Sequence, residues 1–150
     1  MIERYFEAYP GVRAYLDDTI VQAKEHGYAE TMFGRRRHIP ELRSGNAVQR
    51  GFGERTAMNH PMQGSAADII KLAMTQVQQR LHDEVQRRLM AGGFEAKLLL
   101  QVHDELDFSV PEAEIEPVSA LVKDVMEHAA VLRVPLDVDI SFGDTWAESH

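Results

Sequence analysis

The sequence contains no cysteine, which excludes a disulfide scaffold. It also has no long apolar run, so no membrane-spanning segment is predicted. The opening residues, Met1 to Arg4, do not form the charged-then-apolar pattern of an export leader, and a cytoplasmic location is expected. With 150 residues, of which 44% are hydrophobic and 27% charged, the chain has the length of one domain and the composition of a globular protein.

Basic residues are fewer than acidic ones, 16 against 24, and the net charge of −8 argues against nucleic-acid binding. The charges are unevenly distributed, however. Residues 34–55 contain six arginines and two glutamates, whereas residues 104–150 contain twelve acids and two basic side chains. This asymmetry indicates a polyanion site beside a cation site, although solvated charged faces are the commoner explanation of such patterns.

Helices and one hairpin are expected in the first half of the chain. The apolar spacing predicts a helix that is interrupted at Pro10 and ends at Gly27. A hairpin with a glycine turn is predicted over residues 28–39. A second helical region is predicted over residues 47–90, with a break or kink at Pro61 because proline lacks a backbone donor.

Beyond this proline, apolar residues recur at helical spacing and form one stripe: Ile69, Ile70, Ala73, Val77, Leu81, Val85 and Leu89. Gly92-Gly93 is expected to end the helix. A strand is then predicted over residues 94–102, with Leu98-Leu99-Leu100 as its buried centre. His103-Asp104 is predicted as a tight turn that leads into a return strand over residues 105–110.

A helix over residues 114–131 and an alternating strand over residues 134–142 follow in the prediction. The second half thus has the order α-β-β-α-β, and the predicted fold class is α+β. This order matches the ferredoxin-like split β-α-β-β-α-β unit without its first strand, which lies in the middle of the intact sheet. Another segment or a partner supplies that strand, or it is the stretch from Tyr28 to Met32 that we assign to the hairpin.

The pentapeptide Gln101-Val102-His103-Asp104-Glu105 is the sharpest candidate site. Two adjacent acids at the tip of an apolar hairpin repel each other, and a divalent cation removes that cost. Hard oxygen ligands at a strand turn suit Mg²⁺, and two such ions about 3.5–4 Å apart support phosphoryl transfer. The alternatives are a polar turn with solvated carboxylates and a histidine with a purely structural role.

A second candidate is a row of hydrogen-bond donors, Arg55, Asn59 and Gln63, spaced to share one helix face if the kink at Pro61 is mild. Such donors contact phosphates and base edges, and in the minor groove they sense pair shape without reading sequence. A solvent-facing helix stripe is the alternative. The run Arg35-Arg36-Arg37 is a weaker signal, typical of phosphate contacts and of soluble turns alike.

These residues together resemble the family A DNA polymerases, the family of bacterial DNA polymerase I. The resemblance rests on Arg55-x3-Asn59-x3-Gln63-Gly64, its continuation to Lys71, and Gln101 to Glu105. The Tyr5-to-Val12 segment and Gly34-Arg35-Arg36-Arg37 with Pro40 fit the same family. The similarity covers essentially all 150 residues, and the motifs are specific in combination rather than singly.

The resemblance implies a polymerase palm with a helical remnant of the fingers. Residues 1–60 would be the fingers-derived segment and residues 61–150 the palm. Asp104 would bind the two catalytic Mg²⁺ ions, Glu105 would assist, and His103 would lie near the primer terminus. The helix that carries Arg55, Asn59 and Gln63 would contact primer–template DNA. The implied reaction, in DNA replication and repair, is attack of a primer 3′-hydroxyl on the α-phosphate of a dNTP.

The family also has a second metal-binding aspartate on the first palm strand and a fingers helix whose lysine and tyrosine grip the dNTP. Neither precedes Met1, so an upstream polymerase region is expected in the full-length protein, and the isolated chain is expected to be inactive. A nucleoid-associated cytoplasmic location is implied.

Two alternatives remain open. One is a non-catalytic DNA-binding module that uses the Arg55 face and the arginine hairpin. The other is a metal-dependent phosphohydrolase that uses His103, Asp104 and Glu105.

Overall fold

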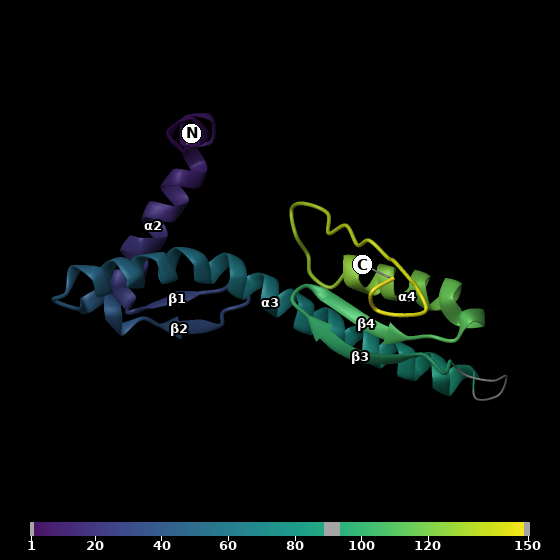
Figure 1. Ribbon diagram of the computed structural model, residues 1–150. Helices are drawn as coiled ribbons and strands as arrows, with labels where there is room; N and C mark the ends of the chain where they lie inside the picture. The colour runs from purple at the N-terminus through teal and green to yellow at the C-terminus, as the bar shows by residue number, and fades with distance from the viewer. Residues whose placement is uncertain (1, 89–93, 149–150) are drawn as a thin grey trace. The chain divides into compact units, whose positions relative to one another are not determined.

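A computed structural model describes residues 2–88 and 94–148, and these form helices and two small sheets (Figure 1). The predicted mixture of helices and strands is confirmed. The chain divides into two compact units, Met1–Asp68 and Ile69–His150, here called the amino-terminal and carboxy-terminal units. No helix within residues 2–88 and 94–148 is both long and apolar enough to cross a bilayer. The functional division into residues 1–60 and 61–150 stays a prediction.

The amino-terminal unit begins with two helices, α1 (Ile2–Ala8) and α2 (Pro10–His26), where an interruption at Pro10 was expected. Proline is tolerated at the first position of α2 because the amide at that position has no partner within the helix. Gly27 ends α2 in the left-handed conformation, with φ of 83°, and its amide donates to the Ala23 carbonyl at 2.8 Å. The predicted glycine cap is therefore confirmed.

The predicted hairpin is also confirmed. Strands β1 (Tyr28–Glu30) and β2 (Arg36–His38) pair antiparallel, and Gly34 in the connection has a positive φ of 81°. The short 3₁₀ helix η1 (Pro40–Arg43) follows. The buried core of this unit takes one residue each from α2, β1, the position between β2 and η1, η1, and the next helix: Ala23, Ala29, Ile39, Leu42 and Ala57.

The long helix α3 (Ala47–Arg88) runs through Pro61 without ending there. The predicted break is therefore wrong. The hydroxyl of Ser65 donates to the carbonyl of Pro61, one turn earlier in the helix, and the surrounding turn is packed against the hairpin loop. The apolar stripe is confirmed as far as the structure describes it, with these members buried: Ile70, Ala73, Val77 and Leu81. The structure does not describe the side chain of Val85. The predicted stripe residue Leu89 and the predicted helix end at Gly92-Gly93 lie outside the described residues.

The carboxy-terminal unit holds a second hairpin, β3 (Lys97–Val102) and β4 (Glu105–Ser109), followed by η2 (Glu112–Glu114) and α4 (Ile115–Glu127). The hairpin, the later part of α3 and α4 surround one apolar core (Figure 1). Its buried members come from α3, from the approach to β3 and from α4: Val77, Leu81, Phe94, Val118, Val122 and Val125. The predicted tight turn at positions 103 and 104 is confirmed.

The predicted buried centre of β3 is wrong. Leu99 is 62% exposed and Leu100 is 50% exposed. The pairing shifts between Leu98 and Leu100, which lie opposite Phe108 and Asp107 respectively. Because Phe108 and Asp107 are consecutive, they point to opposite faces, so this bulge turns Leu100 away from the core.

The predicted strand over residues 134–142 is also wrong, because this segment has no ladder in the structure, and α4 ends at Glu127 rather than at residue 131. A strand needs a neighbour to pair its backbone groups, and the sheets of the described chain contain only β1–β2 and β3–β4. Of the alternating apolar residues in this segment, only Leu136 and Val138 are half-buried. The stretch from Tyr28 to Met32 does not supply the first strand of the unit either, because β1 pairs with β2.

Candidate functional site

The turn between β3 and β4 presents His103 and Asp104, and Glu105 begins the second strand. His103 adopts a φ of 52°, in the left-handed region that side chains other than glycine rarely occupy. This conformation costs roughly 1–2 kcal/mol for an L-residue. The side-chain amide of Gln101 donates to the His103 carbonyl at 2.6 Å and supports the strained turn. Strain held in this way is typical of functional sites.

All three side chains at this turn, those of His103, Asp104 and Glu105, are exposed. Exposed carboxylates fit Mg²⁺, which keeps several water ligands and is bound through one or two carboxylates together with substrate phosphates. Within residues 2–88 and 94–148, no group of three His, Cys, Asp or Glu side chains could hold a metal ion. A metal site at Asp104 and Glu105 would therefore need further ligands from outside the described residues.

The second candidate face lies on α3, in the amino-terminal unit. Arg55, Asn59 and Gln63 are all exposed, and the helix that carries them is continuous through Pro61. Spacings of four residues then place the three side chains along one face. An open groove of about 690 Å³ adjoins this face, and its lining comprises Pro40, Glu41, Ser44, Val48, Gln49, Phe52 and Arg55. The structure thus provides an exposed row of donors beside a groove with a half-exposed aromatic side chain.

The arginine run is divided between different partners. Arg35 donates from Nε to Asp68 at 2.7 Å and from Nη2 to the Gly64 carbonyl at 2.9 Å. Arg36 donates to Glu30 at 2.6 Å and lies 4.6 Å from the Tyr28 ring centroid. The hydrogen bond that Arg36 donates to Glu30 raises the pKa of Arg36 above its ordinary value. Two of the three arginines are therefore engaged within the amino-terminal unit, which weakens the hypothesis of a simple phosphate-binding run.

Asp68 is the residue in this region that sequence analysis did not single out. It follows the Gln63-Gly64 pair on α3, and its side chain is only 12% exposed. Its position within the motif that continues to Lys71 was visible, but nothing in the spacing indicated that it pairs with a residue 33 positions earlier.

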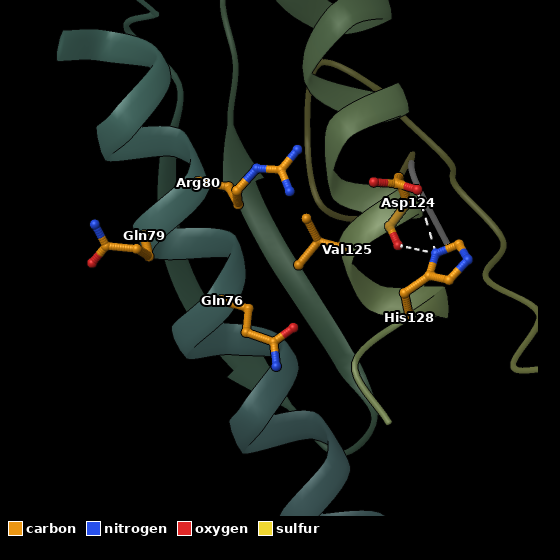
Figure 2. Close-up of a pocket in the computed structure, with 6 residues that line it drawn as sticks. All are labelled: Gln76, Gln79, Arg80, Asp124, Val125 and His128. Carbon is orange, nitrogen blue, oxygen red and sulfur yellow. Dashed lines mark hydrogen bonds and ion pairs between the residues drawn. The ribbon is translucent and has the colours of Figure 1, made fainter. Parts of the chain in front are cut away.

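A further shallow groove of about 300 Å³ lies between α3 and α4 in the carboxy-terminal unit (Figure 2). Gln76, Gln79 and Arg80 come from α3, Asp124 and Val125 come from α4, and His128 directly follows α4. The His128 Nδ1 atom lies 2.7 Å from the Asp124 carbonyl oxygen. Figure 2 shows Gln79 directed away from α4. The side chains of Asp124 on α4 and of His128 after it are 61% and 77% exposed, so this groove offers no enclosed binding site.

Comparison with known proteins identifies the family. The model of DNA polymerase family A matches residues 1–148. DNA polymerase I of Geobacillus stearothermophilus is 51% identical over 148 residues, which are 99% of this chain and 16% of that protein. DNA polymerase I of Pseudomonas aeruginosa is 46% identical over 149 residues, 99% of this chain and 15% of that protein. The chain belongs to DNA polymerase family A.

A solved structure gives the same result. The POL domain of Pol1 from M. smegmatis, in complex with DNA primer-template and dNTP, superposes with a TM-score of 0.91 and 45% identity. The match covers 99% of this chain and 25% of that one. The chain thus spans about a sixth of the length of the curated relatives that it matches and a quarter of the solved domain.

Proposed function

We propose that this chain takes part in template-directed DNA synthesis, as the palm and adjoining fingers portion of a family A polymerase. The observation that carries the proposal is the strained, exposed turn at His103, Asp104 and Glu105, found in a chain that belongs to this family. The similar Pol1 domain is a complex with primer-template and dNTP, which supports the same substrates here.

Asp104 and Glu105 are the proposed Mg²⁺ ligands. When bound, the metal stabilises the charge that develops on attacking and leaving oxygens in phosphoryl transfer. In the proposed reaction, the primer 3′-oxygen forms a bond to the α-phosphorus of the dNTP, the bond to the β-phosphate breaks, and pyrophosphate leaves. The proposed place of His103 is beside the primer terminus, at the tip of the same turn.

Arg55, Asn59 and Gln63 are the proposed contacts to primer–template DNA. All three donate hydrogen bonds, and the acceptors in the minor groove occupy similar places in every Watson–Crick pair. The row therefore senses the shape of the pair and favours no particular base.

The isolated chain is proposed to lack polymerase activity. Two carboxylates on one turn do not hold two metal ions, and the described residues provide no third ligand grouped with them. The second aspartate and the dNTP-binding lysine that the family resemblance implies are proposed to lie in an upstream region. The same shortage of ligands argues against the phosphohydrolase alternative.

Replacement of Asp104 by alanine in a full-length polymerase that contains this chain tests the proposal. We expect primer extension to fall by roughly a hundredfold or more, the scale for loss of one transition-state electrostatic contact. Affinity for primer–template should change little. Asp139→Ala, at an exposed acid in the segment after α4, is the matched control and should keep full activity. A variant at Asp104 that extends primers normally would show that the metal role is wrong.

A non-catalytic DNA-binding role is the second candidate, favoured by the exposed row on α3 and the groove beside it. It predicts that the isolated chain binds duplex DNA and that affinity falls steeply with salt, through counterion release. Asp104→Ala should leave that binding intact.

A further inference from the structure

The loop of the first hairpin is tied to α3 through both ends. Thr31, directly after β1, donates from Oγ1 to Asp68 Oδ2 at 2.8 Å. Arg35, just before β2, donates from Nε to Asp68 Oδ1 at 2.7 Å. The loop is itself closed by a backbone hydrogen bond of 2.9 Å from Thr31 to the Arg35 carbonyl. One carboxylate on α3 therefore holds both sides of the loop.

A second set of contacts lies one turn earlier on α3. Arg35 also donates from Nη2 to the Gly64 carbonyl at 2.9 Å. The Met32 amide donates to Ser65 Oγ at 3.0 Å, and the Ser65 hydroxyl in turn donates to the Pro61 carbonyl. A Cβ atom at Gly64 would lie 2.6 Å from Thr31 Cγ2, so the loop rests directly on the helix backbone at this glycine.

These contacts surround the turn of α3 that carries Gln63. Pro61 has no amide hydrogen and leaves the helix one hydrogen bond short in this turn. Gly64 and Ser65 are buried beneath the loop, whereas Gln63 is exposed. The loop thus packs against the buried side of this turn of α3 and leaves the Gln63 side chain exposed to solvent.

We propose that Arg35 and Asp68 are positioning residues whose ion pair sets the place and orientation of Gln63 against primer–template DNA. This inference rests on the proposed function, in which Gln63 contacts the DNA. Arg35 acts through the helix and not as a phosphate ligand, because its Nε and Nη2 are committed to Asp68 and to the Gly64 carbonyl.

Asp68→Asn in a full-length polymerase that contains this chain is the decisive variant. It removes one negative charge, so a purely electrostatic effect on DNA, or an Arg35 freed to bind phosphate, would strengthen binding. A positioning role predicts the opposite, an increase in the Kd for primer–template of roughly threefold to tenfold, within the range of coupling between neighbouring residues. Equal or tighter binding by Asp68→Asn overturns the proposal.

Arg35→Met, Arg35→Lys and a double-mutant cycle with Gln63→Ala complete the test. Arg35→Met should raise the Kd about as much as Asp68→Asn, and Arg35→Lys should recover part of the loss. In the Gln63→Ala background, Arg35→Met and Asp68→Asn should change the Kd little further, because the side chain that Arg35 and Asp68 position is absent. Full additivity with Gln63→Ala would assign the pair a merely structural role and overturn the proposal.

Lys24→Met is the matched control, because it also removes one positive charge and one ion pair to α3, the 2.5 Å contact with Glu54. We expect it to leave the Kd unchanged within about twofold, as sites without shared partners act independently. An equal loss with Lys24→Met overturns the proposal. If Gln63→Ala itself leaves the Kd unchanged, the DNA-contact part of the proposed function fails, and that result is separate from the behaviour of Arg35 and Asp68.

Discussion

The side-chain amide of Gln101 donates a 2.6 Å hydrogen bond to the backbone carbonyl of His103, across the turn that presents Asp104. The bond joins the end of β3 to the residue with the strained backbone. The conformation of the turn therefore depends on a side chain that does not itself belong to the proposed metal site.

Gln101→Leu removes this bond at similar side-chain size. A net loss of about 1 kcal/mol, typical of one hydrogen bond, corresponds to a roughly fivefold decrease in the rate of nucleotide addition if the turn must be ordered for catalysis. Single-turnover primer extension by a full-length polymerase measures this rate. An unchanged rate would mean that the turn holds its shape without Gln101.

Substitutions at His103 separate backbone strain from side-chain function. His103→Val should lower the free energy of unfolding by about 1–2 kcal/mol, because a β-branched residue tolerates a positive φ poorly. His103→Gly should have a small net effect, because relief of strain offsets the extra freedom of glycine in the unfolded chain. Urea unfolding of both variants of the 150-residue chain checks that His103→Val is the less stable of the two.

Gly64→Ala should destabilise the amino-terminal unit by about 1–3 kcal/mol, as overpacking does, because the new methyl group would lie 2.6 Å from Thr31 Cγ2. Thr31→Ser removes that methyl group and keeps the hydroxyl, so the double variant should recover most of the loss. Gly11→Ala is the control, with open space around the added atom. Because alanine favours helix, we expect it to stabilise α2 by about 0.5–1 kcal/mol.

Asp107 carries a buried side-chain oxygen, Oδ2, with no hydrogen-bond partner among the described residues. An unsatisfied buried oxygen costs about 1–3 kcal/mol, so Asp107→Leu should raise the free energy of unfolding. Thermal and urea unfolding of the 150-residue chain test this, with the neighbouring exposed Ser109→Ala as control. A lower stability in Asp107→Leu would show that the carboxylate has a stabilising role.

The ion pair between Lys24 and Glu54 predicts one part of the pH dependence of stability. The hydrogen bond from Lys24 lowers the pKa of Glu54 in the folded state. The stabilisation is therefore complete above the ordinary pKa of a glutamate and is lost as the pH falls through the lowered value. Lys24→Met should weaken the decline of stability in this acidic range, measured by urea unfolding from neutral pH downwards. An identical decline in both proteins would contradict the assignment.

Local signals in the sequence predicted the turns and the helix faces well. Gly27 and Gly34 adopt the positive φ values that their positions implied, and the stripe on α3 is buried. Long-range signals were weaker. The strand over residues 134–142 failed because pairing requires a neighbour that a periodic pattern cannot supply. Pro61 was expected to break α3, but packing against a loop 33 positions earlier in the chain, through Met32 and Ser65, overrides its local effect.

The residues of the candidate site show the same difference between local and long-range signals. His103, Asp104 and Glu105 were recognisable because adjacent acids at a tight turn are costly without a cation. Asp68 was not, because its partner Arg35 is brought to it only by folding. The exposure of Leu100 also escaped prediction, since one extra residue in β3 changes its face and no composition rule marks the bulge.

That bulge makes the length of β3 as important as its composition. Leu98 lies opposite Phe108 and Gln101 lies opposite Leu106, so the extra residue at Leu99 puts both on the same face of the hairpin although they are three positions apart. Deletion of Leu99 would leave a regular ladder in which Leu98 and Gln101 keep these partners, whereas one further residue inserted between Leu100 and Gln101 would send Gln101 to the other face. Insertions between Lys97 and Val102, and deletions of paired residues there, should therefore be rarer in functional variants of this chain than deletion of the unpaired Leu99.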